Sequence, residues 1–213
     1  MIETRFSKVQ AQCPICLNEE PVTVWQVING STDPDLKEKL LRKQLQIQHC
    51  SNCGNSTVLS YPLLYLDPDS RQMYFCMSGL AVAASREAVE ALPDPASWQL
   101  RLVKDYNQLI EKIHIADHHC DDRLIELIKL AAVRQGEYDI KEDCFYFLTA
   151  DDHNFRFMAA QSDGQWYTLD LESETYLNAE QLVPNLPELA GQWQTIGRDY
   201  ARQLLKRLAG DEE

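Results

Sequence analysis

Two short cysteine motifs decide the fold of this chain: Cys13-Pro14-Ile15-Cys16 and Cys50-Ser51-Asn52-Cys53. In each motif the gap of two residues lets a tight turn aim both sulfurs at one point. Two such turns facing each other would supply four thiolate ligands to one tetrahedral metal ion, and zinc is the expected occupant. Because cysteine would fill every position, no water could be activated, so the motifs predict a structural zinc rather than a catalytic one.

The segments around the first motif predict a β-rich module. Arg5–Gln12 and Val22–Ile28 are rich in strand-forming residues and flank the first cysteine turn. Gly54 follows the second motif and can adopt the left-handed conformation in which such a turn often ends. Leu17 stands at the equivalent position of the first motif, so the two turns need not match.

A helix is predicted between the two motifs. Asp33 is placed as its N-cap and Pro34 at its first position, and the helix is expected to continue over Leu36–Gln46. Leucines cover one half of the helical wheel, which favours packing on the sheet, whereas the alternative is a helix displayed to a partner. The basic residues of this helix form the most concentrated positive face of the chain: Lys37, Lys39, Arg42 and Lys43.

A hairpin and a domain boundary follow the second motif. The segments Thr57–Leu66 and Gln72–Met77 are predicted strands joined by a turn, and Cys76 is expected to be a small buried hydrophobic residue. Pro93 and Pro95 end a helical segment, which predicts a boundary there. The expected domains are a zinc-ribbon-like β module with an inserted helix over 1–92 and a second α+β domain over 96–213.

The second half predicts a helical hairpin followed by a β-meander. Leu100–Ile115 and Arg123–Gln135 carry helical periodicity and are expected to pair. Three strands are expected in an antiparallel meander, over Cys144–Leu148, Phe155–Gln161 and Trp166–Leu171. Thr175–Leu182 and a last amphipathic helix bearing Trp193 would cover one face of it. The expected core of this half includes Tyr106, Ile110, Ile113, Leu124, Ile128, Phe145, Phe147, Phe157, Trp166 and Leu204.

The loop between the two predicted helices holds the other cluster of metal-ligand residue types. His114 and His118 stand four residues apart, a spacing that can place two ligands on one helical turn. Asp121 and Asp122 lie where an N-cap belongs, which favours an ordinary surface loop. The acidic surroundings are expected to raise the pKa of Cys120, which argues against a reactive thiol.

Composition and charge limit the compartment and the partners. The chain has 213 residues, 45% hydrophobic content and seven cysteines, and it begins without the apolar run of a signal peptide. It also lacks the roughly 18 consecutive apolar residues of a membrane span. A reducing cytoplasm is therefore expected.

The net charge is unevenly distributed along the chain. Residues 1–95 carry a net charge of −3 and residues 96–213 carry −10, which together give the −13 of the chain. The acidic second half disfavours nucleic acid as a partner.

Several stretches of this chain resemble one family. The matching stretches are Cys13–Cys16, Asp33–Leu41, Cys50–Gly54 and Pro62–Pro68, then Arg101–Val103, Leu109–Ile113, Asp121–Asp122 and Ile125–Lys129. They resemble the bacterial CpXC-domain family. The resemblance implies a zinc-ribbon-like unit joined to an α+β unit and lends no established activity. The chain departs from the family at Ser51, where many members have a second proline, and at Leu17, which stands in place of glycine.

The sequence favours a non-enzymatic function. It contains no Gly-x-Ser-x-Gly elbow, no phosphate-binding glycine loop and no His-Glu-x-x-His motif. We therefore expect a zinc-binding protein that acts as a protein-interaction or adaptor module, with the basic inserted helix as its contact. The alternatives are nucleic-acid or ribosome contact through the ribbon, and an unrecognised enzyme. For an enzyme, thiol redox chemistry at Cys13 and Cys16 is the best case.

Overall fold

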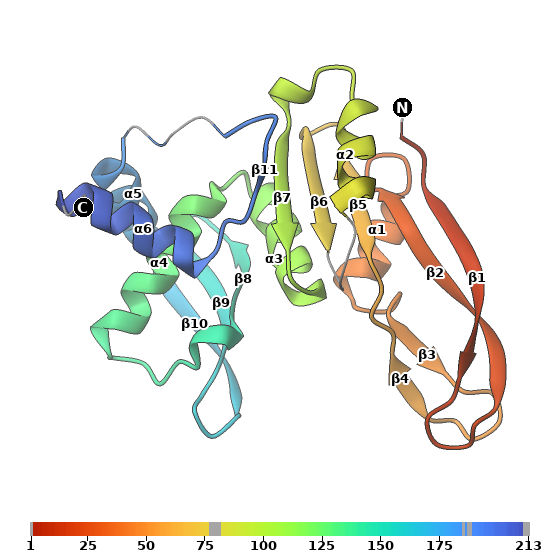
Figure 1. The fold of residues 1–213 in the computed structure, drawn as a ribbon. Coiled ribbons are helices and arrows are strands. Elements are labelled where there is room, and N and C mark those ends of the chain that lie inside the picture. The colour runs from red at the N-terminus through yellow and green to blue at the C-terminus, as the bar shows by residue number, and fades with distance from the viewer. Residues whose placement is uncertain (1, 77–81, 185, 187–188, 211–213) are drawn as a thin grey trace. The chain divides into compact units, whose positions relative to one another are not determined.

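The computed structural model describes residues 2–76, 82–184, 186 and 189–210 (Figure 1). Helices and strands are mixed throughout, so the predicted α+β class is confirmed. The chain divides into two compact units, one of Met1–Tyr106 with Ala190–Trp193 and one of Asn107–Leu189 with Gln194–Glu213. The first unit extends beyond Pro93. That residues 1–92 and 96–213 fold as independent domains stays a prediction. No helix of the described residues is long and apolar enough to cross a membrane.

The first unit is built on a six-stranded mixed sheet. Its strands lie in the order β1 (Arg5–Gln12), β2 (Glu19–Asn29), β5 (Leu63–Asp67), β6 (Gln72–Cys76), β7 (Gln99–Val103) and β11 (Trp193–Gln194). The pairs β2–β5 and β6–β7 are parallel, and parallel neighbours need a long crossover connection. One crossover contains α1 (Pro34–Leu41), β3 (Ile47–His49) and β4 (Ser56–Val58); the other contains α2 (Val82–Glu90) and η1 (Pro95–Ser97). The second cysteine motif therefore lies within a crossover of the sheet.

One face of this sheet forms the main core of the first unit. Ala88 of α2 packs in the same cluster as the sheet residues Val27, Leu64, Leu66, Met73, Phe75 and Leu100. Cys76 is 1% exposed, as predicted, and burial raises the pKa of its thiol to about 12. Strand β6 ends at Cys76, and the predicted last strand residue Met77 lies outside the described residues.

The prediction of one helix over Leu100–Ile115 is wrong in its first part. Gln99–Val103 is strand β7, and helix α3 begins only at Tyr106 and runs to Asp117. Leu100 is fully buried and pairs with β6 across a parallel ladder. Short apolar runs fit a helical face and a buried strand equally well, and here the neighbouring strand decides the outcome.

The inserted helix is shorter than predicted. It begins at Pro34, as expected, but α1 ends at Leu41 rather than Gln46. Lys43 adopts a left-handed backbone with φ of 59°, which ends the helix, and Leu40 is the buried residue of α1. Asp33 occupies the N-cap position, but its carboxylate accepts a hydrogen bond from Thr4 Oγ1 at 2.6 Å instead of capping the helix.

The second unit contains the predicted meander. Strands β8 (Phe145–Ala150), β9 (Asn154–Ala160) and β10 (Trp166–Glu172) pair antiparallel in the order β10-β9-β8. The remaining elements of the unit are α3, α4 (Asp122–Gln135), η2 (Glu142–Cys144), α5 (Ser173–Leu182) and α6 (Arg198–Ala209). Trp193 lies in β11 and not in the last helix, which begins at Arg198.

Most of the predicted core of the second half is buried. The confirmed residues are Ile110, Ile113, Leu124, Ile128, Phe145, Phe147, Phe157 and Leu204. The prediction that Trp166 is buried is wrong, because this residue is 53% exposed. It alternates with Tyr167 along β10, so it points to the face opposite the buried Leu169. Tyr106 is half-buried and belongs to the first unit.

Candidate metal centre

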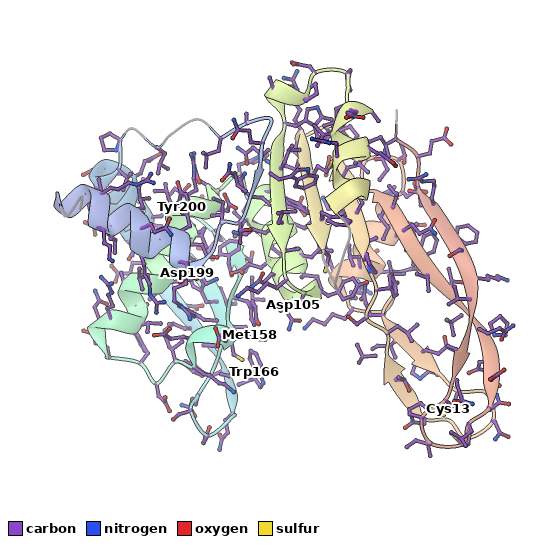
Figure 2. The ribbon with its side chains drawn as sticks, in the orientation of Figure 1. Cys13, Asp105, Met158, Trp166, Asp199 and Tyr200 are labelled. Atoms are coloured by element: carbon purple, nitrogen blue, oxygen red, sulfur yellow. The ribbon has the colours of Figure 1, made fainter. Side chains whose placement is uncertain are left out.

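The four cysteines meet at the ends of two hairpins. Cys13 and Cys16 lie in the turn between β1 and β2, and Cys50 and Cys53 lie in the turn between β3 and β4. Figure 1 shows both turns at the same end of the first unit, where Figure 2 labels Cys13. The four Sγ atoms all lie within 4.8 Å of one another. The fold therefore brings together residues that are 34 and 40 positions apart.

The sulfur positions fit one tetrahedral metal ion. Cys13 Sγ lies 3.7 Å from Cys53 Sγ, and Cys16 Sγ lies 3.5 Å from Cys50 Sγ. A tetrahedron of zinc–sulfur bonds near 2.3 Å has edges of about 3.8 Å. Both measured distances join one motif to the other. The described residues contain no other group of three or more histidine, cysteine, aspartate or glutamate side chains arranged to hold a metal.

The two cysteine turns have the same backbone structure. In the first turn Leu17 N–H donates to Cys13 O at 3.0 Å, and in the second Gly54 N–H donates to Cys50 O at 2.9 Å. Leu17 has a φ of 60° and Gly54 a φ of 71°, so both are left-handed. The departure from glycine at Leu17 therefore does not change the turn. The sequence carried a sign of this likeness, because Asn follows each motif at the second position.

Leu17 adopts at some cost a conformation that glycine adopts freely. A left-handed backbone costs a residue with a side chain about 1–2 kcal/mol. Replacing Leu17 with glycine would remove this cost, but glycine makes the unfolded chain more flexible, which offsets about half of the gain in folding free energy. Since the Leu17 side chain is 64% exposed, its removal sacrifices little packing. Leu17→Gly is therefore expected to tighten metal binding severalfold, measured by competition with a chelator.

The matched control for Leu17→Gly is Gly54→Ala in the other turn. A Cβ at Gly54 would meet nothing within 4 Å, so only backbone strain opposes the change. Gly54→Ala is expected to weaken metal binding. Equal affinities for wild type and both variants would show that the left-handed position does not affect the stability of the site.

The surroundings shift the pKa values of two of the cysteines in opposite directions. A hydrogen bond from the Asn52 side chain, helped by the backbone of Asn18, lowers the pKa of Cys16 to about 6. The Asn55 backbone favours the Cys53 thiolate, but the neighbouring Cys16 sulfur and burial outweigh it and raise the pKa of Cys53 to about 12. Without metal, Cys16 is therefore the more acidic of these two thiols, and Cys53 holds a proton that a bound cation would displace.

Sequence reasoning missed two residues of this site. Asn52 reaches across to the first motif, and Glu20 of β2 accepts hydrogen bonds from Ser51 of the second. Glu20 and Ser51 are 31 residues apart, and such a contact leaves no pattern of spacing in one sequence. Only the pairing of the hairpins places them together.

The centre is closed on its inner side and open on its outer side. Cys13 and Cys50 are buried, Cys16 is half-buried and Cys53 is exposed. A metal bound by all four thiolates would have no free position for a water or substrate. The arrangement therefore suits a metal that links two hairpins.

The histidine loop of the second unit does not form a comparable group. His118 Nδ1 lies 2.8 Å from the backbone oxygen of His114, and its Nε2 lies 2.8 Å from Thr149 Oγ1. Both ring nitrogens therefore have protein partners. Asp121 caps α4 by accepting from the backbone N–H of Arg123 at 2.8 Å, which confirms the predicted cap. Burial first and Asp121 second raise the pKa of Cys120 to about 11.

Comparison with known proteins identifies the family. The family model of the CpXC protein matches residues 11–129, which include both cysteine motifs and more than half of the chain. No curated protein and no solved structure matches the chain significantly. The matched range contains all four cysteines whose sulfurs converge. The chain belongs to the CpXC family.

Proposed function

We propose that the chain is a zinc-binding protein of the cytoplasm whose zinc is structural and whose function is to bind another protein. Cys13, Cys16, Cys50 and Cys53 are the proposed ligands, and a set of four cysteine thiolates is a common structural zinc site. Seven free cysteines suit a reducing compartment. The bound zinc would offset part of the thiolate charge and crosslink the two motifs.

The hairpins that carry the cysteines depend on such a crosslink. No residue of β1, β3 or β4 is buried. Small units without a hydrophobic core of sufficient size are commonly held by a metal. This supports a structural role for the zinc and leaves the biological activity to other surfaces.

The main support for a protein-interaction function is the exposed aromatic and methionine face of the meander. Trp166 is 53% exposed and stacks on Tyr146 with ring centroids 6.3 Å apart. Met158, 37% exposed, pairs with Tyr146 across β8 and β9 and lies on the same face. Figure 2 labels Met158 and Trp166 on this sheet. Tryptophan, tyrosine and methionine are enriched in protein interfaces, so a partner with an apolar contact surface fits this face.

The basic inserted helix is a weaker candidate for the partner-binding surface than the sequence suggested. Lys37 Nζ lies 3.4 Å from Asp67 Oδ2, and Arg42 pairs with Glu38 at 2.5 Å. Lys39 and Lys43 remain exposed. The meander face lies in residues 96–213, which carry a net charge of −10. This negative charge disfavours binding of a nucleic-acid backbone there and supports a protein partner.

The proposed contact is tested by retention of partner proteins from a nuclease-treated extract of the source cells. Trp166→Ala is expected to reduce retention of a specific protein at least tenfold, because central tryptophans contribute most to interface energy. Leu182→Ala is the control, since Leu182 is 73% exposed on α5 of the same unit. The double variant Lys39→Glu/Lys43→Glu should retain the partner.

Other outcomes would place the function elsewhere. Loss of the partner only in the Lys39→Glu/Lys43→Glu variant would move the contact to α1 and the turn that follows it. Retention by Trp166→Ala equal to that of wild type would contradict the meander face. Retention of partners only from an extract that was not treated with nuclease, together with a log-linear fall in binding as salt rises, would indicate nucleic acid as the partner instead.

A further inference from the structure

Glu20 connects the two halves of the metal centre. Its backbone is fixed beside the first cysteine turn, because Glu20 lies in β2 and pairs with Ala11 of β1. Its carboxylate reaches the second turn, where it accepts from Ser51 N–H at 3.2 Å and from Ser51 Oγ at 2.7 Å. Gln48 Nε2 of β3 also donates to Glu20 Oε1, at 3.2 Å.

These contacts use the carboxylate in a way that no neutral side chain repeats. Both Glu20 oxygens accept hydrogen bonds, and the donors are a backbone N–H, a hydroxyl and an amide NH₂. A glutamine would direct its own NH₂ at one of these donors and lose at least one bond. Glu20, Gln48, Cys13 and Cys50 also line one small cavity beside the sulfurs, so the clamp lies directly next to the metal ligands.

We propose that Glu20 is a positioning residue that holds the second cysteine turn against the first, so that the four sulfurs converge before a metal arrives. This inference rests on the proposed zinc site. Binding a metal at two separate turns requires their relative motion to be lost, and a clamp that fixes them in advance removes part of that cost. Partners in the outer shell of metal sites typically change metal affinity by about 10–100-fold.

The positioning role and a purely electrostatic role predict opposite signs. A zinc ion with four thiolates carries a net negative charge, and the Glu20 carboxylate adds another negative charge nearby. If Glu20 acted only through its charge, its removal would favour the thiolates and strengthen zinc binding. If Glu20 acts as a clamp, its removal weakens zinc binding.

The test compares Glu20→Gln with Glu19→Gln in the full chain. Glu19 is the exposed neighbour in β2, so its substitution changes the same charge at almost the same place. Zinc affinity is measured by chelator competition, and exchange of the Ser51 amide hydrogen is measured in the metal-free protein. We expect Glu20→Gln to bind zinc about 10–100-fold more weakly and to expose the Ser51 amide, whereas Glu19→Gln leaves both unchanged.

Ser51→Ala provides a milder variant that keeps the test valid if Glu20→Gln fails to fold. It removes the hydroxyl donor and is expected to lower zinc affinity less than Glu20→Gln does. In the Ser51→Ala background, Glu20→Gln should cost less than it does alone, because the two residues share a bond. Equal or tighter zinc binding by Glu20→Gln, with wild type binding zinc, would overturn the clamp. A wild-type chain that takes up no zinc would instead refute the proposed zinc site itself.

Discussion

Replacement of Cys50 with serine is expected to release the metal and to unfold the hairpins that carry the cysteines. A serine hydroxyl does not replace a thiolate ligand, and structural zinc sites contribute an apparent binding energy of about 10–16 kcal/mol in small zinc-finger units. Since β1, β3 and β4 contain no buried residue, little else would hold these hairpins together. Cys144→Ser is the matched control, because Cys144 lies in η2 of the second unit.

Hydrogen exchange measured element by element shows how far the damage of Cys50→Ser extends. We expect protection to be lost in β1, β3 and β4 and retained in β8, β9 and β10, whose aromatic core includes Phe147 and Phe157. Chelation of the wild-type metal should give the same result. Simultaneous loss of protection in both halves would mean that they share one core and that the predicted boundary near Pro93 is wrong.

Replacement of Lys129 with methionine is expected to destabilise the second unit by about 3–5 kcal/mol, the usual cost of leaving a buried charge unpaired. Lys129 Nζ lies 2.8 Å from Glu111 Oε1 and 3.1 Å from Glu126 Oε1. Glu111 is 2% exposed and also accepts from the backbone N–H of Phe147 at 2.8 Å, which attaches α3 to strand β8. Methionine would fill the volume but leave the carboxylate without its partner.

The buried network explains why the effect is large. It contains two ammonium groups and three carboxylates, because Lys112 Nζ also lies 2.9 Å from Asp122 Oδ2 and 3.7 Å from Glu126 Oε1. Burial alone would lower the pKa of Lys129, but Glu111 and Glu126 outweigh it and raise that pKa. Loss of Lys129 would double the net negative charge of the network.

The Lys129→Met prediction is checked by denaturant unfolding monitored in the second unit. Arg156→Met is the control, because Arg156 pairs with Asp170 on the surface, and such pairs contribute about 0–1 kcal/mol. Adding Glu111→Gln to Lys129→Met should recover much of the loss, since it removes the unpaired charge. Equal costs for Lys129→Met and Arg156→Met would contradict this account of the network.

The Lys129→Met defect should also depend on pH. Burial raises the pKa of Glu111 in the folded chain, and removal of Lys129 removes a group that opposes this rise. A carboxyl whose folded pKa exceeds its unfolded value stabilises the fold below the unfolded value and loses that contribution as pH rises through the folded value. The variant should therefore lie closer to wild type in acid than at neutral pH.

The sequence predicted the features that rest on local patterns. The spacing of Cys13, Cys16, Cys50 and Cys53 identified the residues whose sulfurs converge. The three meander strands and the cap at Asp121 were also recognisable, because each depends on residues close in sequence. The match of the two cysteine turns was missed, since Leu17 concealed it.

Features that depend on distant neighbours were not predictable. Leu100 lies in a strand because β6 is available to pair with it, and its own sequence fits a helix as well. Glu20 and Ser51 meet only after two hairpins have packed. The ion network joining Glu111 to Lys129 breaks the expected polar-outside pattern of α3 and α4, because each buried charge has a partner on the other helix.

X-ray absorption at the zinc edge, combined with elemental analysis of the native protein, determines whether the four cysteines hold one zinc ion. We expect one zinc per chain with four sulfur neighbours at about 2.3 Å and no lighter ligand. Cys144→Ser should give the same spectrum, and Cys50→Ser should lose the metal. Absence of stoichiometric zinc, or a spectrum with nitrogen or oxygen neighbours in place of any of the four sulfurs, would contradict it.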